Sequence, residues 1–313
     1  NENRGEKMEL ALGIHDVTQL DLLEDMYDPN FLSPMEKETI DLLNEAVDRA
    51  YGPIELSRMY FGSEFCQYRI APLEDVKRAY EAAREKGLRF TYVTPYVPED
   101  GMNKLFPILH WLNERETPCE VVVNDWGIGY AISTRYPNVK IVLGRLLNKM
   151  IRDPRVAHLY NEKSAPELAK SVFMNTSLET PYFKRFLSKL GVDRVEYDSF
   201  IQPVEKSTER EGLNASLYLG YGVVATGRSC LVGTLHKPRE EKFQGDVQCK
   251  QQCTLYVAQM ENTRPTLGQL PVRTLQKGNT AFYQQTETLM SEGLEWAKEM
   301  GINRLIVSPK IPV

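Results

Sequence analysis

Along the chain, segments whose apolar residues recur with the period of a helix alternate with short apolar segments typical of buried strands. In residues 72–87 apolar side chains return every three to four positions, a proline stands in the first turn and a glycine ends the run, which is typical of an amphipathic helix. Residues 88–93 follow directly and have the length and composition of a buried strand. The same succession of helix, glycine and strand recurs in residues 183–197 and 289–307. The pattern therefore predicts a repeated α/β unit.

Further strands are predicted from short apolar runs at residues 8–14, 56–62, 120–124, 139–143, 172–175, 215–220 and 254–259. Most of these runs are separated by enough residues for a helix, which parallel strands need as a crossover. About eight such units in roughly 250 residues is the count of a (β/α)8 barrel. An open doubly wound sheet is disfavoured, because no glycine-rich phosphate loop follows Ile14.

We therefore predict an α/β fold in which residues 1–313 form a single TIM-like (β/α)8 barrel domain. The barrel should be irregular, because residues 153–168 and 203–213 are polar insertions. Functional side chains are expected in the loops that follow the strands, at the carboxyl mouth of the barrel.

Composition and charge narrow the class of protein. The chain has 38 Lys and Arg against 43 Asp and Glu, a net charge of -5, which gives no strong basic footprint for nucleic acid and leaves only a local basic patch open. No apolar run of about 18 residues and no signal-peptide pattern is visible, so we expect no membrane span and a cytoplasmic protein.

The chain has five cysteines, Cys66, Cys119, Cys230, Cys249 and Cys253, and an odd number in a chain of this size makes a disulfide framework improbable. Four of them fall in predicted mouth loops, and Cys119 is interpreted as a buried thiol. Four thiolates from three loops could bind zinc or an iron–sulfur cluster. Their scattered positions favour the cluster, since structural zinc prefers two close pairs. Spacing alone leaves ordinary buried thiols open.

Other polar residues stand at predicted strand ends. Glu64 and Asp125 are candidate acid or base groups, because burial at a barrel mouth could raise a carboxyl pKa. Arg228, close to the predicted thiolates, could tune a redox potential, bind a carboxylate, or simply pair with an acid of the barrel. His15 is the histidine positioned most like a catalytic group. Three aromatic residues could stack on a planar ring or merely pack: Tyr96, Trp126 and Tyr197.

The segment VVATGRSCLVG at residues 223–233, followed by QCKQQCTLY at residues 248–256, resembles the signature of the collagenase-like peptidase family U32. Upstream, RMYFG at residues 58–62 is similar to the second strand of that family, VVNDWG at residues 122–127 to its strand ending in Asp-x-Gly, and LGVDRV at residues 190–195 to its later helix-to-strand joint. The resemblance spans residues 54–260, and residues 220–256 carry its cysteine signature.

The resemblance is nearest to the members of that family that hydroxylate ubiquinone precursors or RNA bases without molecular oxygen. Those members carry a 4Fe-4S cluster on one early Cys, one signature Cys and a Cys-x-x-x-Cys pair, and Cys66, Cys230, Cys249 and Cys253 match these positions one by one. The resemblance therefore implies a cluster-dependent oxidoreductase acting on a small aromatic molecule or a nucleobase. A Ser between Arg228 and Cys230 departs from the pattern and leaves substrate and subfamily open.

Two alternatives follow from the same resemblance. The family name suggests a peptidase, but the chain has no His-Glu-x-x-His helix and no evident nucleophile with a histidine base. The ubiquinone-type relatives act as pairs, which implies a heteromeric partner and allows a non-catalytic subunit stabilised by a cluster or by zinc.

Overall fold

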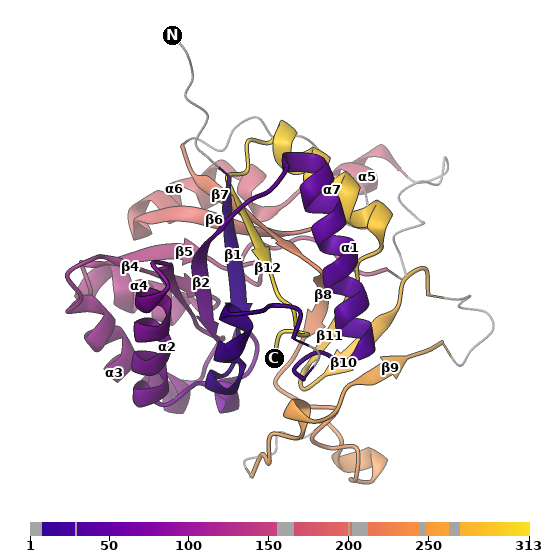
Figure 1. Ribbon diagram of the computed structural model, residues 1–313, viewed down its shortest axis with the longest axis horizontal. Coiled ribbons are helices and arrows are strands. Elements are labelled where there is room, and N and C mark those ends of the chain that lie inside the picture. Colours follow the sequence, from indigo (N-terminus) through magenta and orange to yellow (C-terminus); the bar gives the residue numbers. More distant parts are fainter. Residues whose placement is uncertain are drawn as a thin grey trace.

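The computed structural model describes residues 8–28, 30–154, 166–199, 201, 212–243, 248–262 and 270–313. Eight parallel strands close into a barrel, which confirms the predicted TIM-like α/β fold (Figure 1). In their order around the barrel the strands are β1 (Glu9–Ile14), β2 (Leu56–Gly62), β3 (Arg89–Val93), β4 (Cys119–Val123), β5 (Val139–Leu143), β6 (Val192–Asp198), β7 (Asn214–Leu219) and β12 (Arg304–Val307). The last strand returns to the first and places Leu305 opposite Leu10.

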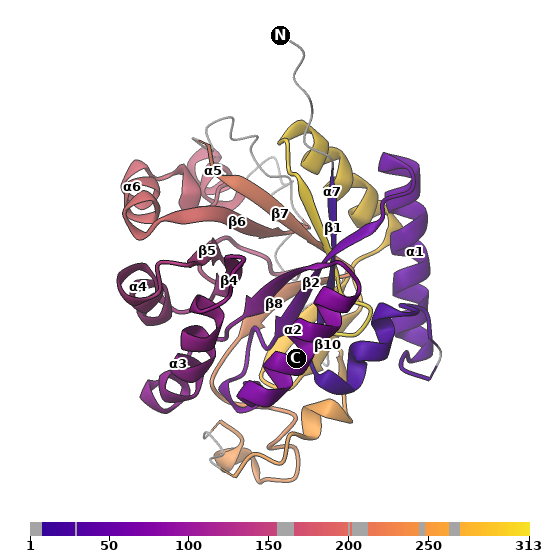
Figure 2. The ribbon, with the colours of Figure 1, turned by 60° about the vertical axis from the view of Figure 1, so that its left-hand side comes forward.

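Helices surround these strands, with α1 and α7 on one side and α3, α4 and α6 on the other in Figure 2. The described helices are α1 (Pro34–Tyr51), α2 (Leu73–Glu85), α3 (Glu99–Asn113), α4 (Trp126–Arg135), α5 (Glu167–Met174), α6 (Pro181–Leu190) and α7 (Glu287–Glu299). The helix predicted in residues 72–87 is confirmed as α2, which buries Val76, Ala79 and Ala83 from its apolar face. Helix α1 begins at a capping box formed by Ser33 and Glu36.

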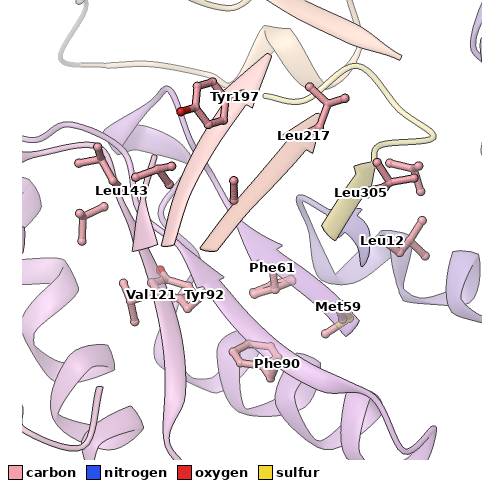
Figure 3. Close-up of a cluster of buried hydrophobic side chains, with 14 of the residues drawn as sticks. Leu12, Met59, Phe61, Phe90, Tyr92, Val121, Leu143, Tyr197, Leu217 and Leu305 are labelled. Atoms are coloured by element: carbon pink, nitrogen blue, oxygen red, sulfur yellow. The ribbon is translucent and has the colours of Figure 1, made fainter. Parts of the chain in front are cut away.

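The core has two layers, because side chains of a strand alternate between its two faces. Outward-facing strand residues pack against the helices, as Met59 and Phe61 do in Figure 3. Tyr60, which stands between Met59 and Phe61 in the sequence, points into the barrel and belongs to a smaller apolar cluster that includes Val122 and Tyr218. Both faces of each strand are therefore buried, which explains the continuous apolar runs in the sequence.

The irregularity of the barrel lies in its last unit. Between β7 and α7 the chain forms a four-stranded antiparallel sheet. Its strands are, in spatial order, β8 (Tyr221–Thr226), β11 (Thr280–Gln284), β10 (Thr274–Lys277) and β9 (Ala258–Met260). This inserted sheet packs on the carboxyl mouth, since Val223, Leu275 and Phe282 share one apolar cluster with Phe65 and Leu146 from the barrel loops. Figure 1 shows it at the lower right of the barrel, beside α1.

Three sequence predictions are wrong. Residues 172–175 are the end of helix α5 rather than a strand, because the run of apolar residues continues a helical turn that begins after Pro166. Residues 254–259 are not a barrel strand: Thr254 ends a 3₁₀ helix, η6 (Gln252–Thr254), and only Ala258 and Gln259 join the inserted sheet. Residues 221–226 follow the predicted strand of residues 215–220 and are therefore expected in a mouth loop, but they form strand β8.

The polar insertions predicted in residues 153–168 and 203–213 fall mainly on residues 155–165 and 202–211, which lie outside the described residues. Within the described ranges, every helix is too short or too polar to cross a lipid bilayer.

Candidate four-cysteine site

The four cysteines of the predicted ligand set come together around one small cavity. Cys66 follows β2 and precedes the 3₁₀ helix η2 (Gln67–Arg69), Cys230 follows β8, and Cys249 and Cys253 flank the start of η6. Three segments that are far apart in the sequence thus contribute one thiol, one thiol and two thiols. We call Cys66, Cys230, Cys249 and Cys253 the four-cysteine site.

Local backbone geometry positions the first of these thiols. Gly62 ends β2 with a φ of +129°, and a Cβ there would stand 2.4 Å from the carbonyl oxygen of Val93, so only glycine lets the chain turn at the mouth. The next turn is closed by Ser63, whose Oγ accepts from the backbone N–H of Cys66 at 3.3 Å. Cys66 is therefore directed by a turn that begins at the end of a barrel strand.

Side chains tie the three segments to one another. The Nδ2 of Asn279 donates to the carbonyl oxygens of Phe65 and Gly227, both at 2.7 Å. The Nε2 of Gln251 donates to the Tyr68 carbonyl at 2.7 Å. The backbone of Gln251 has a φ of 53°, in the left-handed region that residues other than glycine rarely adopt. The η2 segment, the end of β8 and the Cys249–Cys253 segment are thereby held in one arrangement.

Backbone N–H groups point at two of the sulfurs. The N–H of Gly233 donates to Sγ of Cys230 at 3.2 Å, and the N–H of Gln251 donates to Sγ of Cys249 at 3.4 Å. Such hydrogen bonds stabilise negative charge on sulfur and are among the contacts that tune metal–thiolate centres.

Burial makes three of the four thiols, Cys66, Cys230 and Cys253, hard to ionise without a cation. Burial, together with repulsion from the neighbouring sulfurs of Cys253, Cys249 and Cys230, raises the pKa of Cys66 to about 11. Burial likewise raises the pKa of Cys230 and of Cys253. A bound metal centre would reverse this preference, since its charge deprotonates coordinating thiols.

The donor set fits an iron–sulfur cluster in type and number. Tetrahedral zinc with bonds of about 2.3 Å needs four sulfurs about 3.8 Å apart, and among the described residues no three His, Cys, Asp or Glu side chains are arranged to hold a single ion. In a four-iron cluster each Cys binds a different iron, so its ligands stand farther apart. The cavity itself is about 20 Å³, room for about one water, so the surrounding loops would have to move apart to admit a cluster.

Glu64 lies close to this site in sequence but points the other way, into the barrel. Its carboxylate accepts two hydrogen bonds from Arg145, both at 2.8 Å, and Arg145 also donates to Asp198 at 2.5 Å. Arg152 donates to the second oxygen of Asp198 at 2.5 Å. We call Glu64, Arg145, Arg152 and Asp198 the carboxyl-mouth network.

This network is sealed beneath the inserted sheet. Arg145 is 1% exposed, and it and Asp198 contact the backbone of β8 at the Tyr221 carbonyl and the Val223 N–H. Burial raises the pKa of Glu64, and Arg145 opposes that rise. The geometry is that of a structural ion pair, and the acid–base role of Glu64 stays a prediction.

Asp125 and Arg228 have different surroundings. Asp125 caps α4, where its Oδ1 accepts from the N–H of Gly127 at 2.7 Å and from that of Ile128 at 3.1 Å. These two hydrogen bonds give Asp125 a structural role as the cap of α4 that requires no catalytic function. Arg228 is exposed and lines the same cavity as the four cysteines, as its sequence position led us to expect.

The remaining candidates divide by location. Tyr197 packs edge-on against Trp296 in the core, Trp126 packs edge-on against Phe183 and Phe186, and neither ring lines the cavity of the four cysteines. Tyr96 lies beside the site, within 3.2 Å of Asn279.

His15 is partly buried, and Cys119 is buried. Burial lowers the pKa of His15 to about 3, helped by Lys277, so this imidazole is neutral. Cys119 begins β4 at the opposite end of the barrel and cannot join the other thiols.

Sequence reasoning missed the residues that position the site. Asn279 and Gln251 act through contacts between segments more than 180 positions apart. Asp198 ends β6 and Arg145 follows β5, so both stand at strand ends, but their contact with each other and that of Arg145 with Glu64 depend on the barrel order.

Comparisons with known proteins are weak. A scan of protein families finds no match, and a search of curated proteins finds no relative. Among solved structures, the U32 peptidase Mk0906 superposes with a TM-score of 0.43 at 12% identity, covering 100% of this chain and 97% of that one. An immunomodulatory chitinase from Trichuris suis gives 0.34 at 9%, covering 96% and 91%, and an uncharacterised B. cereus protein gives 0.29 at 9%, covering 98% and 62%. Similarities at this level carry no argument about activity.

Proposed function

We propose that the four-cysteine site holds a 4Fe-4S cluster and that the protein is a redox enzyme. The observation that carries this proposal is the convergence of Cys66, Cys230, Cys249 and Cys253 from three segments on one cavity, with backbone N–H groups directed at two of the sulfurs. When every iron has a Cys ligand, such a cluster supplies one-electron transfer.

The reaction class comes from the sequence resemblance: hydroxylation of a small aromatic molecule or a nucleobase without molecular oxygen. The conversion balances if a substrate C–H and water give C–OH, two protons and two electrons, the electrons leaving to an external one-electron acceptor. In this scheme Arg228, exposed at the edge of the site, binds a carboxylate or phosphate of the substrate.

The test is metal analysis of protein purified without oxygen. Wild type should be brown and contain about four iron and about four sulfide per chain. Cys230→Ala should lose the visible absorption, whereas Cys119→Ala, which removes a buried thiol at the far end of the barrel, should keep it. Colourless protein with one zinc, or equal iron in both variants, would refute the proposal.

A non-catalytic partner subunit is the second candidate, and one observation favours it. Directly after Cys253, the side chains of Leu255, Tyr256 and Val257 are 78%, 61% and 43% exposed. Adjacent exposed apolar side chains mark an interaction surface more often than a free one. Cluster content without any turnover of aromatic acids or RNA bases by the isolated chain would select this candidate.

The peptidase alternative has no such support. In the described part of the chain, the mouth carboxylates Glu64 and Asp198 are paired with arginines, and burial raises the pKa of the Cys66, Cys230 and Cys253 thiols. Neither pattern supplies an activated nucleophile.

A further inference from the structure

A cavity of about 710 Å³ opens at the amino mouth of the barrel, the end opposite the four-cysteine site. Several of its lining residues are the first residues of their strands, among them Glu9 of β1, Arg89 of β3 and Arg304 of β12. A volume of this size suits a small-molecule ligand. Residues at the amino mouth of such barrels normally contribute to the stability of the fold. The arrangement of charges around this cavity therefore distinguishes a structural role from ligand binding.

Part of the lining forms an ion-pair network of two arginines and two glutamates, and Arg89 adds a third guanidinium 3.2 Å from Glu9. Arg58 contacts Glu9 at 3.1 Å and Glu120 at 3.2 Å, and Arg304 binds both of the same carboxylates. Burial alone would raise the pKa of Glu120, but hydrogen bonds and charge from Arg304 hold that pKa at about 2. We call Glu9, Arg58, Glu120 and Arg304 the amino-mouth network.

Arg194 adds a positive charge that this network does not compensate. Its side chain is 7% exposed, and its Nη1 donates to the Ala215 carbonyl at 2.8 Å, to Asn303 Oδ1 at 2.8 Å and to Ser216 Oγ at 3.2 Å. Throughout the described ranges, no carboxylate lies within 4.0 Å of this guanidinium. Burial and the nearby Arg304 lower its pKa, and the charges of Glu120 and Glu9 offset this only in part.

Lys140 adds a second uncompensated charge on the exposed rim. It also has no acidic side chain within 4.0 Å among the residues that the structure describes, and with Arg194 it lines both this cavity and a neighbouring one of about 610 Å³. That neighbour adds Lys184 and Asp193. Six basic side chains line the larger cavity against two acidic ones, and both acids belong to the amino-mouth network.

We propose that the amino mouth binds a phosphate-bearing small molecule. Arg194 is the buried contact, because its guanidinium is fixed through Nη1 and no residue in the described part of the chain hydrogen-bonds its other nitrogens, which leaves them for a ligand. Guanidinium groups bind phosphate oxygens in two-point contacts, and the surplus charge concentrates anions in the cavity. Tyr80 and Phe90 line the same cavity and can pack against an apolar part of the ligand.

Calorimetric titration with pyrophosphate in a chloride buffer of physiological ionic strength tests the site. Wild type should bind about one pyrophosphate per chain, and Lys140→Gln should weaken binding several-fold. Arg194→Gln should weaken it about tenfold or more, since a charge-assisted hydrogen bond is lost. Arg78→Gln is the matched control for Lys140→Gln, because Arg78 is also an exposed cation but lies outside both cavities.

If Arg194→Gln fails to fold, Lys140→Gln and Arg89→Gln decide, because Lys140 is exposed and the Arg89 side chain is 68% exposed. No saturable binding by wild type, or equal weakening by Lys140→Gln and Arg78→Gln, would overturn the proposal. The iron content should be the same in all of these variants, so failure here is independent of the four-cysteine site.

Discussion

The two mouths of the barrel carry similar buried ion pairs and differ in what covers them. The carboxyl-mouth network lies under the inserted sheet, and its four side chains are at most 8% exposed. The amino-mouth network borders an open cavity and has the uncompensated charges of Arg194 and Lys140 beside it. At the carboxyl mouth, the charged side chains therefore connect the barrel to the inserted sheet. At the amino mouth, the charges of Arg194 and Lys140 line a cavity that solutes can enter.

The largest expected effect comes from breaking the carboxyl-mouth network. Arg145→Met should lower the free energy of unfolding by about 3–5 kcal/mol, because it leaves the buried Glu64 carboxylate without its partner and Asp198 with Arg152 as its remaining ion pair. Urea denaturation measures this. Arg84→Met, which removes an exposed pair with Glu81, should cost less than about 1 kcal/mol. Equal losses in the two variants would contradict the assignment of Arg145.

Glu196, on β6 inside the barrel, gives a pH-dependent contrast with the amino-mouth network. Burial raises its pKa from 4.5 to about 8, and the charge of Glu64 adds to this effect. The folded state therefore holds a proton that the unfolded state releases, so the contribution to stability is complete below pH 4.5 and is lost as pH rises through about 8.

Glu196→Gln should remove this loss and keep the contact with the Tyr218 hydroxyl. The variant should exceed wild type by about 1–3 kcal/mol at alkaline pH and lose that advantage at acid pH. Glu120, whose pKa is about 2, has the opposite sign, since its contribution is lost as pH falls. A pH-independent difference between Glu196→Gln and wild type would contradict the raised pKa.

Asn279 tests how the four-cysteine site is held together. Asn279→Ala leaves the carbonyls of Phe65 and Gly227 without their donor and should cost about 1–3 kcal/mol. Under the proposed function it should also speed the loss of iron when the protein is exposed to air. Unfolding curves and the decay of visible absorption measure the two effects, and unchanged values of both would show that Asn279 positions nothing.

Asp125→Ala has the smallest expected effect. Loss of the α4 cap should cost about 1 kcal/mol. If Asp125 only caps the helix, Asp125→Asn or Asp125→Ser should restore most of the stability and any turnover. A variant that is stable and yet inactive would instead support the acid–base role predicted from its position.

The sequence was sufficient to predict the barrel because the outer and inner faces of its strands are both buried, which produces apolar runs of strand length. The sequence also grouped Cys66, Cys230, Cys249 and Cys253 as one candidate ligand set. That grouping came from their resemblance to a family signature and not from any knowledge of the distances between them. The sequence failed at residues 172–175, since a short apolar run fits helix and strand equally well.

Contacts set by the closure of the barrel could not be predicted. Arg194 meets Asn303 and Ala215 because β6, β7 and β12 are neighbours, and no local pattern contains that order. The same holds for the pairing of Glu64 with Arg145 across 81 positions. Local patterns thus predicted the elements, while the charges of both mouths follow from the arrangement of those elements.

Electron paramagnetic resonance of oxygen-protected, dithionite-reduced protein tests the central claim most directly. The account predicts the signal of one reduced 4Fe-4S cluster per chain, lost in Cys66→Ala and Cys253→Ala and retained in Cys119→Ala. A protein that shows no such signal after reconstitution with iron and sulfide, or one that keeps it without Cys66 and Cys253, would contradict the assignment of the four-cysteine site.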